Sequence, residues 1–334
     1  MIAADMHCDT ISALYELRQR GEAGDIGKNS LHIDLEKMEK GGYGVQNFAI
    51  FAHMENLKGK MPLTEYGFFL ADLFLQEMRK YPEKIGIVRS FSDIEANLKA
   101  GRMSAMLTME EGGICQGKLE YLRIFYELGV RMFTFTWNFP NELAWPNRVR
   151  MTGEHAGIFE PETERGVTET GFLFLEEMER LGMILDVSHL GDKGIFDVIA
   201  HAKRPFVASH SNARAVCGHP RNLTDEMIRG ISEKGGVIGI NYCPAFLRDK
   251  EKFGSPMKVS LDDVVLHIRH MYQVGGEDCV GLGSDFDGTN ISFEMKGAAD
   301  LLLLAQKLEK EGFHQSQIEK IFSGNVFRVY REVL

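Results

Sequence analysis

Short apolar runs alternate with longer helical patterns along the whole chain, and this alternation constrains the fold more than any other feature. Eight runs are predicted as strands because they are short, rich in apolar residues and bounded by turn signals. They comprise residues 2–9, 45–52, 103–111, 130–137, 183–189, 205–210, 237–242 and 279–285. Most are almost continuously apolar, which is typical of parallel strands that are buried on both faces.

The segments between these runs have the start and stop signals of helices. Thr168 opens one helical pattern that stops at Gly182, and Thr224 opens another that stops at Gly235. No Pro/Ser-rich linker or block of charge divides the chain. We therefore predict a single (β/α)8 TIM barrel over residues 1–334. A doubly wound open sheet is the main alternative, but no glycine-rich phosphate-binding motif follows the first strand.

Two segments fall outside the repeat. Residues 85–88 are predicted as an accessory strand, because the run is short and apolar but has no place among the eight. Residues 138–166 are irregular and are predicted as a long βα loop insertion over the mouth of the barrel.

The charge and cysteine content narrow the classes of partner and the compartment. The chain has 38 Lys and Arg against 48 Asp and Glu, a net charge of −10, which disfavours nucleic-acid and anionic membrane partners. Its five cysteines form no CxxC pair, which argues against a disulfide scaffold. The N-terminus has no leader pattern, and no uncharged run is long enough to span a membrane. We expect a cytoplasmic protein.

Ionisable residues gather at the carboxyl ends of the predicted strands, which meet at one rim of a barrel. They are His7, Asp9, Glu110, Glu111, Asp186, His189, His210, Asp285 and Asp287. Imidazole and carboxylate together suit zinc or another first-row divalent ion. Strand alternation puts His7 and Asp9 on one face, so one ion can bind both, and directs Cys8 into the helix layer.

These residues stand in motifs that together resemble a known family. The motifs are His7-Cys8-Asp9, Glu111-Gly112-Gly113, Asp186-Val187-Ser188-His189, Ser209-His210-Ser211, Arg221-Asn222 and Asp285-Phe286-Asp287-Gly288. The chain resembles the membrane (renal) dipeptidase family of binuclear zinc peptidases, within the amidohydrolase-like metal-dependent hydrolases. The resemblance spans most of the chain, and it implies two Zn²⁺ per chain and a homodimer.

The resemblance also implies roles for single residues. His7 and Asp9 would hold one zinc ion, His189 and His210 the other, and Glu111 would bridge the two. Asp285 would hydrogen-bond the bridging water and transfer its proton, and Arg221 would bind the free carboxylate of the substrate. One departure is that no His follows the fourth strand, where Trp137-Asn138 stands, so Asn138 or a zinc ion would stabilise the oxyanion.

The function implied is a zinc-dependent dipeptidase that hydrolyses dipeptides, including L-Xaa-D-Xaa, by attack of a metal-bridging hydroxide. An alternative is a binuclear amidohydrolase that acts on N-acyl amino acids or on another small amide or lactone, because Arg221 requires only a free carboxylate. A barrel that merely binds metal is a third possibility. Asp285 argues against it, since a binding protein needs no proton shuttle beside its metals.

Overall fold

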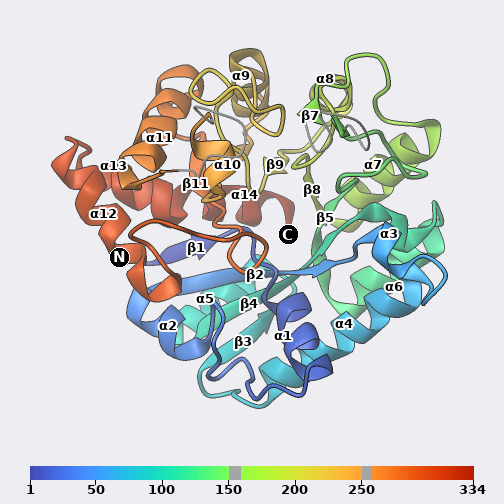
Figure 1. Ribbon diagram of the computed structural model, residues 1–334, viewed down its shortest axis with the longest axis horizontal. Helices are drawn as coiled ribbons and strands as arrows, with labels where there is room; N and C mark the ends of the chain where they lie inside the picture. The colour runs from blue at the N-terminus through green and yellow to red at the C-terminus, as the bar shows by residue number, and fades with distance from the viewer. Residues whose placement is uncertain (150–158, 250–257) are drawn as a thin grey trace.

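The computed structural model describes residues 1–149, 159–249 and 258–334, and its parallel strands close into a barrel (Figure 1). Hydrogen bonds join the strands in the order β2-β1-β11-β10-β9-β8-β5-β4, and pairing of β2 with β4 closes the ring. The strands are β1 (Ala3–Asp5), β2 (Tyr43–Phe51), β4 (Met103–Glu110), β5 (Val130–Thr134), β8 (Ile184–Asp186), β9 (Val207–Ala208), β10 (Val237–Ile240) and β11 (Val280–Leu282). The predicted (β/α)8 barrel is confirmed.

The predicted accessory strand is also present, as β3 (Ile85–Val88) outside the ring. One edge of β4 pairs with β2 along seven residues, and its other edge pairs first with β3 and then with β5. In the predicted 138–166 loop, β6 (Arg148–Val149) and β7 (Phe159–Glu160) form an antiparallel pair. Residues 150–158 of that loop lie outside the described residues.

Several observed strands end before the predicted ones do, because side chains take over the backbone hydrogen bonds at the rim. The prediction for residues 183–189 extended through His189, whereas β8 ends at Asp186. There the Asp186 carboxylate accepts hydrogen bonds from the backbone N–H groups of Ser188 and Ser209, at 2.9 and 2.8 Å. The residues beyond the strand ends are thereby held by polar side chains in place of a ladder.

Helices alternate with the strands along the chain, and most of them surround the ring on the outside (Figure 1). They are α1 (Thr10–Gln19), α2 (Leu35–Gly41), α3 (Met54–Leu57), α4 (Leu63–Arg79), α5 (Phe91–Lys99), α6 (Leu119–Leu128), α7 (Glu169–Leu181), α8 (Asp192–His201), α9 (Asp225–Glu233), α10 (Pro244–Leu247), α11 (Leu261–Gly275), α12 (Leu301–Lys310), α13 (Gln315–Glu319) and α14 (Asn325–Val333). Short 3₁₀ turns cover Gly112–Cys115 and Ala298–Asp300, and a π-helical turn covers Lys320–Gly324. The predicted start of α7 is confirmed, because the Thr168 hydroxyl accepts a hydrogen bond from Gly171 N.

Two apolar layers hold the barrel together. The larger lies between strands and outer helices, and the smaller fills the interior with one residue from each of several strands, such as Val45, Met106 and Ile184. Helix α14 contributes Val326 and Tyr330 to the interior layer. It lies near the middle of the barrel in Figure 1, where the C-terminus is also found. The interior is thus a packed core, and chemistry is confined to the rim.

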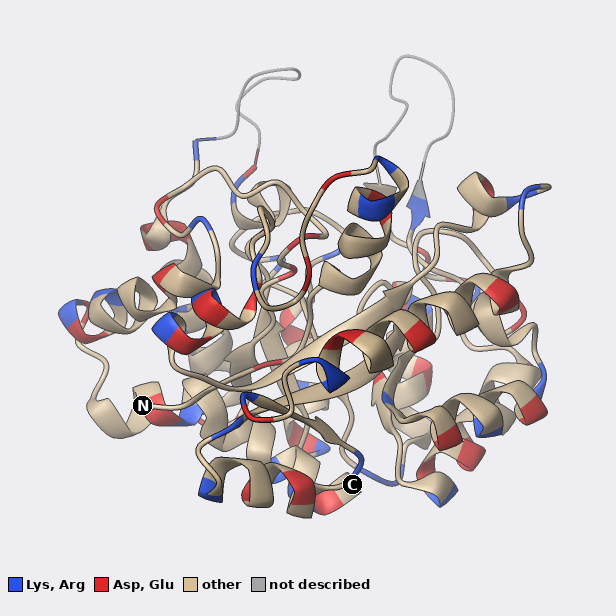
Figure 2. Cartoon of the chain, turned by 90° about the horizontal axis from the view of Figure 1, so that it is seen from below, with Lys and Arg blue, Asp and Glu red and all other residues tan. Residues whose placement is uncertain are grey.

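Acidic and basic residues are interspersed along the outer helices, as the colours of Figure 2 show. Within the described part of the chain, no helix has both the length and the apolar character that a membrane crossing requires.

Candidate active site

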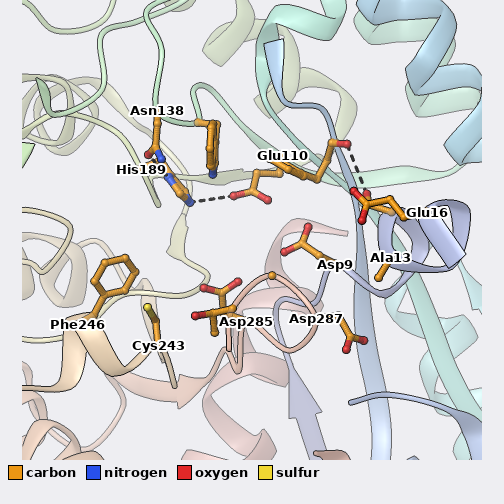
Figure 3. Close-up of a pocket in the computed structure, with 15 residues that line it drawn as sticks. Asp9, Ala13, Glu16, Glu110, Asn138, His189, Cys243, Phe246, Asp285 and Asp287 are labelled. Carbon is orange, nitrogen blue, oxygen red and sulfur yellow. Dashed lines mark hydrogen bonds and ion pairs between the residues drawn. The ribbon is translucent and has the colours of Figure 1, made fainter. Parts of the chain in front are cut away.

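Side chains from five strand ends converge on one point at the rim of the barrel, and Figure 3 shows several of them facing one another across a cavity. Glu110, the last residue of β4, lies at the centre. One of its oxygens is 2.9 Å from His189 Nε2 and 3.6 Å from His210 Nε2, and the other is 3.5 Å from His7 Nε2. Asp9 Oδ2 lies 3.3 Å from the same nitrogen of His7. The predicted histidines and Asp9 are therefore brought together.

Glu111 is not part of this cluster. The structure contradicts its predicted place between the histidines, where Glu110 lies instead. Glu111 follows the end of β4, with a φ of 91°, and its carboxylate turns away from the histidines. It accepts hydrogen bonds from Gly113 N at 2.7 Å, Trp137 N at 3.0 Å and Asn141 Nδ2 at 2.6 Å. Its role is to fix the backbone that follows β4 and β5.

Neighbouring side chains indicate which ring nitrogen of His189 and of His210 bears the proton. His210 Nδ1 is 2.7 Å from the Ser209 hydroxyl, which donates its own proton to Asp186 Oδ2 at 2.5 Å. Asn138 Oδ1 lies 3.0 Å from His189 Nδ1 and can only accept. Both Nδ1 atoms are therefore assigned as donors, which leaves both Nε2 atoms with lone pairs.

These two lone pairs face each other, since the Nε2 atoms of His189 and His210 are 3.0 Å apart. Two acceptors at this distance repel each other, and a cation beside both would relieve the repulsion. In addition, Asp9 Oδ1 is buried and has no hydrogen-bond partner among the described residues. Two overlapping groups, His7 with Glu110 and His210 and His7 with Asp9 and Asp285, offer ligand atoms close enough to share an ion. The donor set thus fits divalent metal ions.

Burial without compensating positive charge perturbs the ionisation of the cluster. Burial disfavours the charged form of His7, but the carboxylates of Glu110 and Asp9 outweigh it and raise the pKa of His7 to about 10. Burial lowers the pKa of His189 and His210 well below the usual range and raises that of Glu110 well above it. The cluster is therefore incompletely neutralised by the protein's own side chains, and dications would supply the missing charge.

Asp285 lies beside the cluster in a strained turn. Its φ is 59° and that of Asp287 is 68°. A Cβ at Gly288, which follows Asp287, would collide with the carboxylates of Asp9 and Asp285. Asn241 Nδ2 donates to Asp285 Oδ2 at 3.0 Å, while Oδ1 is 3.9 Å from His7 Nε2. Burial raises the pKa of Asp285 to about 6. Such strain is typical of functional sites.

Arg221 lies on the side of the site formed by the loop after β9. It is buried, and its Nη2 donates to the backbone oxygen of His210 at 3.4 Å. Its Nε has no hydrogen-bond partner among the described residues, and its guanidinium lies 5.3 Å from the centre of the Phe246 ring. Burial lowers its pKa, although Asp285 and Glu110 oppose this effect. A buried guanidinium with an unused N–H group is suited to bind an anion.

A cavity of about 330 Å³ opens beside the cluster of histidines and carboxylates. Asp9, Glu110, His189 and Asp285 line its middle, and Trp137 and Asn138 also line it. Asn138 was predicted as a donor to an oxyanion. The structure places its oxygen against His189 Nδ1. Cys8, as strand alternation predicted, is buried in the outer apolar layer, with Sγ 3.2 Å from Asn47 O.

Sequence reasoning missed two features of the site. Glu110 was recognised at the rim but not as the central carboxylate, although strand alternation places it on the same face as the interior residue Met106. The support of His210 by Asp186 through Ser209 was also missed, and the adjacent Ser209-His210 pair was the only local signal for it.

The whole chain is similar to known proteins in sequence and fold. A family model described as membrane dipeptidase (peptidase family M19) matches residues 1–334. An uncharacterised protein from the pqqA 5′ region of Klebsiella pneumoniae is 36% identical over 251 residues, which are 75% of this chain and 89% of that protein. An uncharacterised dipeptidase of Schizosaccharomyces pombe is 33% identical over 313 residues, which are 90% of this chain and 72% of that protein.

A solved structure has the same overall architecture. It is a metallo peptidase from Rhodobacter sphaeroides, liganded with a phosphinate mimic of the dipeptide L-Ala-D-Ala. It matches with a TM-score of 0.84 at 27% identity, and the match covers 100% of this chain and 99% of that chain.

Proposed function

The chain belongs to the membrane dipeptidase family, peptidase family M19, and is a metallo-dipeptidase; on this premise we propose that it hydrolyses dipeptides with two zinc ions at the rim cluster. His7 and Asp9 would bind one ion, and His189 and His210 would bind the other. Glu110 would bind both ions. The observation that supports this most is the central position of Glu110 between three imidazole Nε2 atoms. Three imidazoles with carboxylates are a donor set that zinc prefers.

Hydrolysis of a peptide bond requires an activated water, a polarised carbonyl and a proton for the leaving amine. Bound divalent ions would supply the first two, by acidifying a water molecule to hydroxide near neutral pH and by withdrawing charge from the carbonyl oxygen. Asp285 would receive the proton and return it to the amine, because its carboxylate lines the cavity beside the proposed ions. Asn241 orients the Asp285 carboxylate through its hydrogen bond to Oδ2.

Arg221 would select substrates that end in a free carboxylate close to the scissile bond. Its guanidinium is buried and its Nε has no hydrogen-bond partner in the described part of the chain, so a carboxylate would gain a charge-assisted bond there. The L-Ala-D-Ala mimic bound by the Rhodobacter sphaeroides relative supports acceptance of a D-residue at the C-terminal position, which we propose for this chain too.

The test compares hydrolysis of L-Ala-L-Ala, L-Ala-D-Ala, L-Ala-L-Ala amide and N-acetyl-L-Ala by protein loaded with zinc, with metal content measured in the same samples. We expect about two ions per chain and a kcat/KM for the dipeptides about 100-fold above that for the amide, the effect of one charge-assisted contact. Arg221→Met should abolish this preference. No dipeptide turnover by protein containing two zinc ions would refute the proposal, and preference for N-acetyl-L-Ala would favour the amidohydrolase alternative.

We also propose the reducing cytoplasm as its location, because all five cysteines have free thiols. The homodimer stays a prediction that light scattering in solution can test.

A further inference from the structure

The cavity above the rim cluster has two ends with different chemistry. Figure 3 shows Phe246 and Cys243 at one end, Ala13 and Glu16 at the other, and Glu110, Asp9 and Asp285 between them. Arg221 packs against Phe246, so its end of the cavity is the end for the substrate carboxylate. A dipeptide that places its carboxylate there and its scissile carbonyl at the cluster directs its N-terminal residue toward Glu16.

Helix α1 forms this second end. It begins directly after Asp9, and Ser12, Ala13 and Glu16 all line the cavity because residues three and four apart share a helix face. Phe51 and Trp137 form the facing wall, with ring centres 5.1 Å apart. Glu16 lies about 10 Å from Asp9 along the helix axis. Small Ala13 and the two rings thus leave an apolar passage that leads from the reaction centre to a carboxylate.

Glu16 differs from the other carboxylates that line the cavity, because those either belong to the cluster or accept hydrogen bonds on both oxygens. Asp9, Glu110 and Asp285 belong to the cluster. Both oxygens of Asp287 are occupied, one by His32 N at 2.7 Å and the other by the Thr10 hydroxyl at 2.6 Å.

Glu16 has only a loose partner on the solvent side. Its Oε2 is 3.8 Å from Arg20 Nη1, and both side chains of this pair are more than half exposed. The described lining of the cavity contains no lysine or arginine. A cationic group that entered this end would therefore meet a carboxylate that only the exposed Arg20 holds loosely from the solvent side.

We propose that Glu16 is a specificity-determining residue that selects dipeptides with a basic N-terminal side chain, lysine or arginine. The long alkyl stem of such a side chain would pack beside Ala13, Phe51 and Trp137 while its charged group reaches Glu16. This inference rests on the proposed dipeptidase function and assigns the substrate class of the same site. An acidic N-terminal side chain would be repelled from the same position.

The experiment measures kcat/KM for L-Lys-L-Ala and L-norleucyl-L-Ala, which differ at the end of the side chain by one charged group. For the wild-type enzyme with zinc we expect the lysine substrate to be favoured roughly fivefold, the effect of one partly exposed ion pair at moderate ionic strength. The preference should shrink as salt is raised. In Glu16→Gln the ratio should fall to about one, and in Glu16→Lys it should invert.

Glu22→Gln is the matched control. Glu22 pairs with the same Arg20, at 2.6 Å, but does not line the cavity, so its substitution removes the same charge from the same arginine without changing the ratio. A ratio near one in the wild type, with both dipeptides hydrolysed, would overturn the role of Glu16 and leave the dipeptidase function intact. A ratio that Glu22→Gln lowers as much as Glu16→Gln would overturn it as well. Failure to hydrolyse either dipeptide would instead refute the proposed function, and the inference with it.

Discussion

Two adjacent glutamates at the end of β4 offer the most direct test of the site. The substitutions Glu110→Gln and Glu111→Gln make the same change of charge and shape one residue apart. In the structure the first carboxylate lies among three histidines, and the second accepts three hydrogen bonds from the protein's own N–H groups. We therefore expect Glu110→Gln to lose metal ions and activity, and Glu111→Gln to keep its metal ions.

The magnitudes follow from what each carboxylate contacts. Loss of a residue that only hydrogen-bonds to a metal ligand typically weakens metal affinity about 10- to 100-fold. Removing the charge of Glu110, a proposed ligand itself, should therefore weaken metal affinity at least about 100-fold, or roughly 2.7 kcal/mol. For Glu111 two effects oppose each other. The variant loses at least one charge-assisted hydrogen bond, worth about 1.5–3 kcal/mol. It also no longer has a charge to bury, and this burial raises the pKa of the Glu111 carboxyl to about 7 in the wild type. We expect a net change below about 3 kcal/mol in the free energy of unfolding.

The assay is competition of each variant with a zinc chelator, with circular dichroism and thermal unfolding as controls for folding. Both variants should have the far-ultraviolet spectrum of the wild type. If Glu111→Gln lost its ions while Glu110→Gln retained two per chain, the assignment of the central carboxylate from the structure would be wrong.

Two further predictions concern the residues that support the site. Ser209→Ala should weaken metal binding about 10- to 100-fold, because it breaks the hydrogen-bonded link from Asp186 to His210. Thr134→Val removes another hydroxyl that donates to Asp186, at 2.8 Å, and should leave metal binding unchanged. Competition with a chelator measures both effects. Buried His267 accepts a hydrogen bond from Ala213 N and donates one to Leu247 O. Burial lowers its pKa in the folded protein to about 4. As pH falls, the unfolded chain therefore binds a proton at this histidine before the folded protein does. Stability should therefore decline between pH 6.5 and 4 by up to about 3 kcal/mol, and the difference in melting temperature between wild type and His267→Gln should narrow over that range.

The barrel was predictable because its strands are buried on both faces. Burial inside a ring and beneath helices requires nearly continuous apolar runs, and such runs are visible in the sequence without any knowledge of pairing. The accessory strand β3 was visible for the same reason. The ends of the strands were less predictable, because at Asp186 a side chain replaces the ladder as the partner of the backbone N–H groups.

The location of the site at the rim of the barrel was predictable from the sequence. The prediction named Glu111 as the carboxylate between the histidines, whereas Glu110 lies there. Glu110 and Glu111 both end the same apolar run, and the motif with the double glycine favoured the second. Alternation along β4 decides for the first, because Met106 and Glu110 share the interior face whereas Leu107 and Met109 pack in the outer layer. The positive φ of Glu111 then turns its side chain toward the loop after β5.

The contacts that set the protonation of the histidines could not be predicted, because they join residues distant in the sequence. Asn138 and His189 are 51 positions apart, and Asp186 and Ser209 are 23 apart, so no local spacing reports on them. With both Nδ1 atoms assigned as donors, two Nε2 lone pairs face each other at 3.0 Å, and a cation beside both would relieve their repulsion. The residue types at the strand ends thus indicate that metal can bind. The network behind them shows how the folded chain leaves these nitrogens available to bind it.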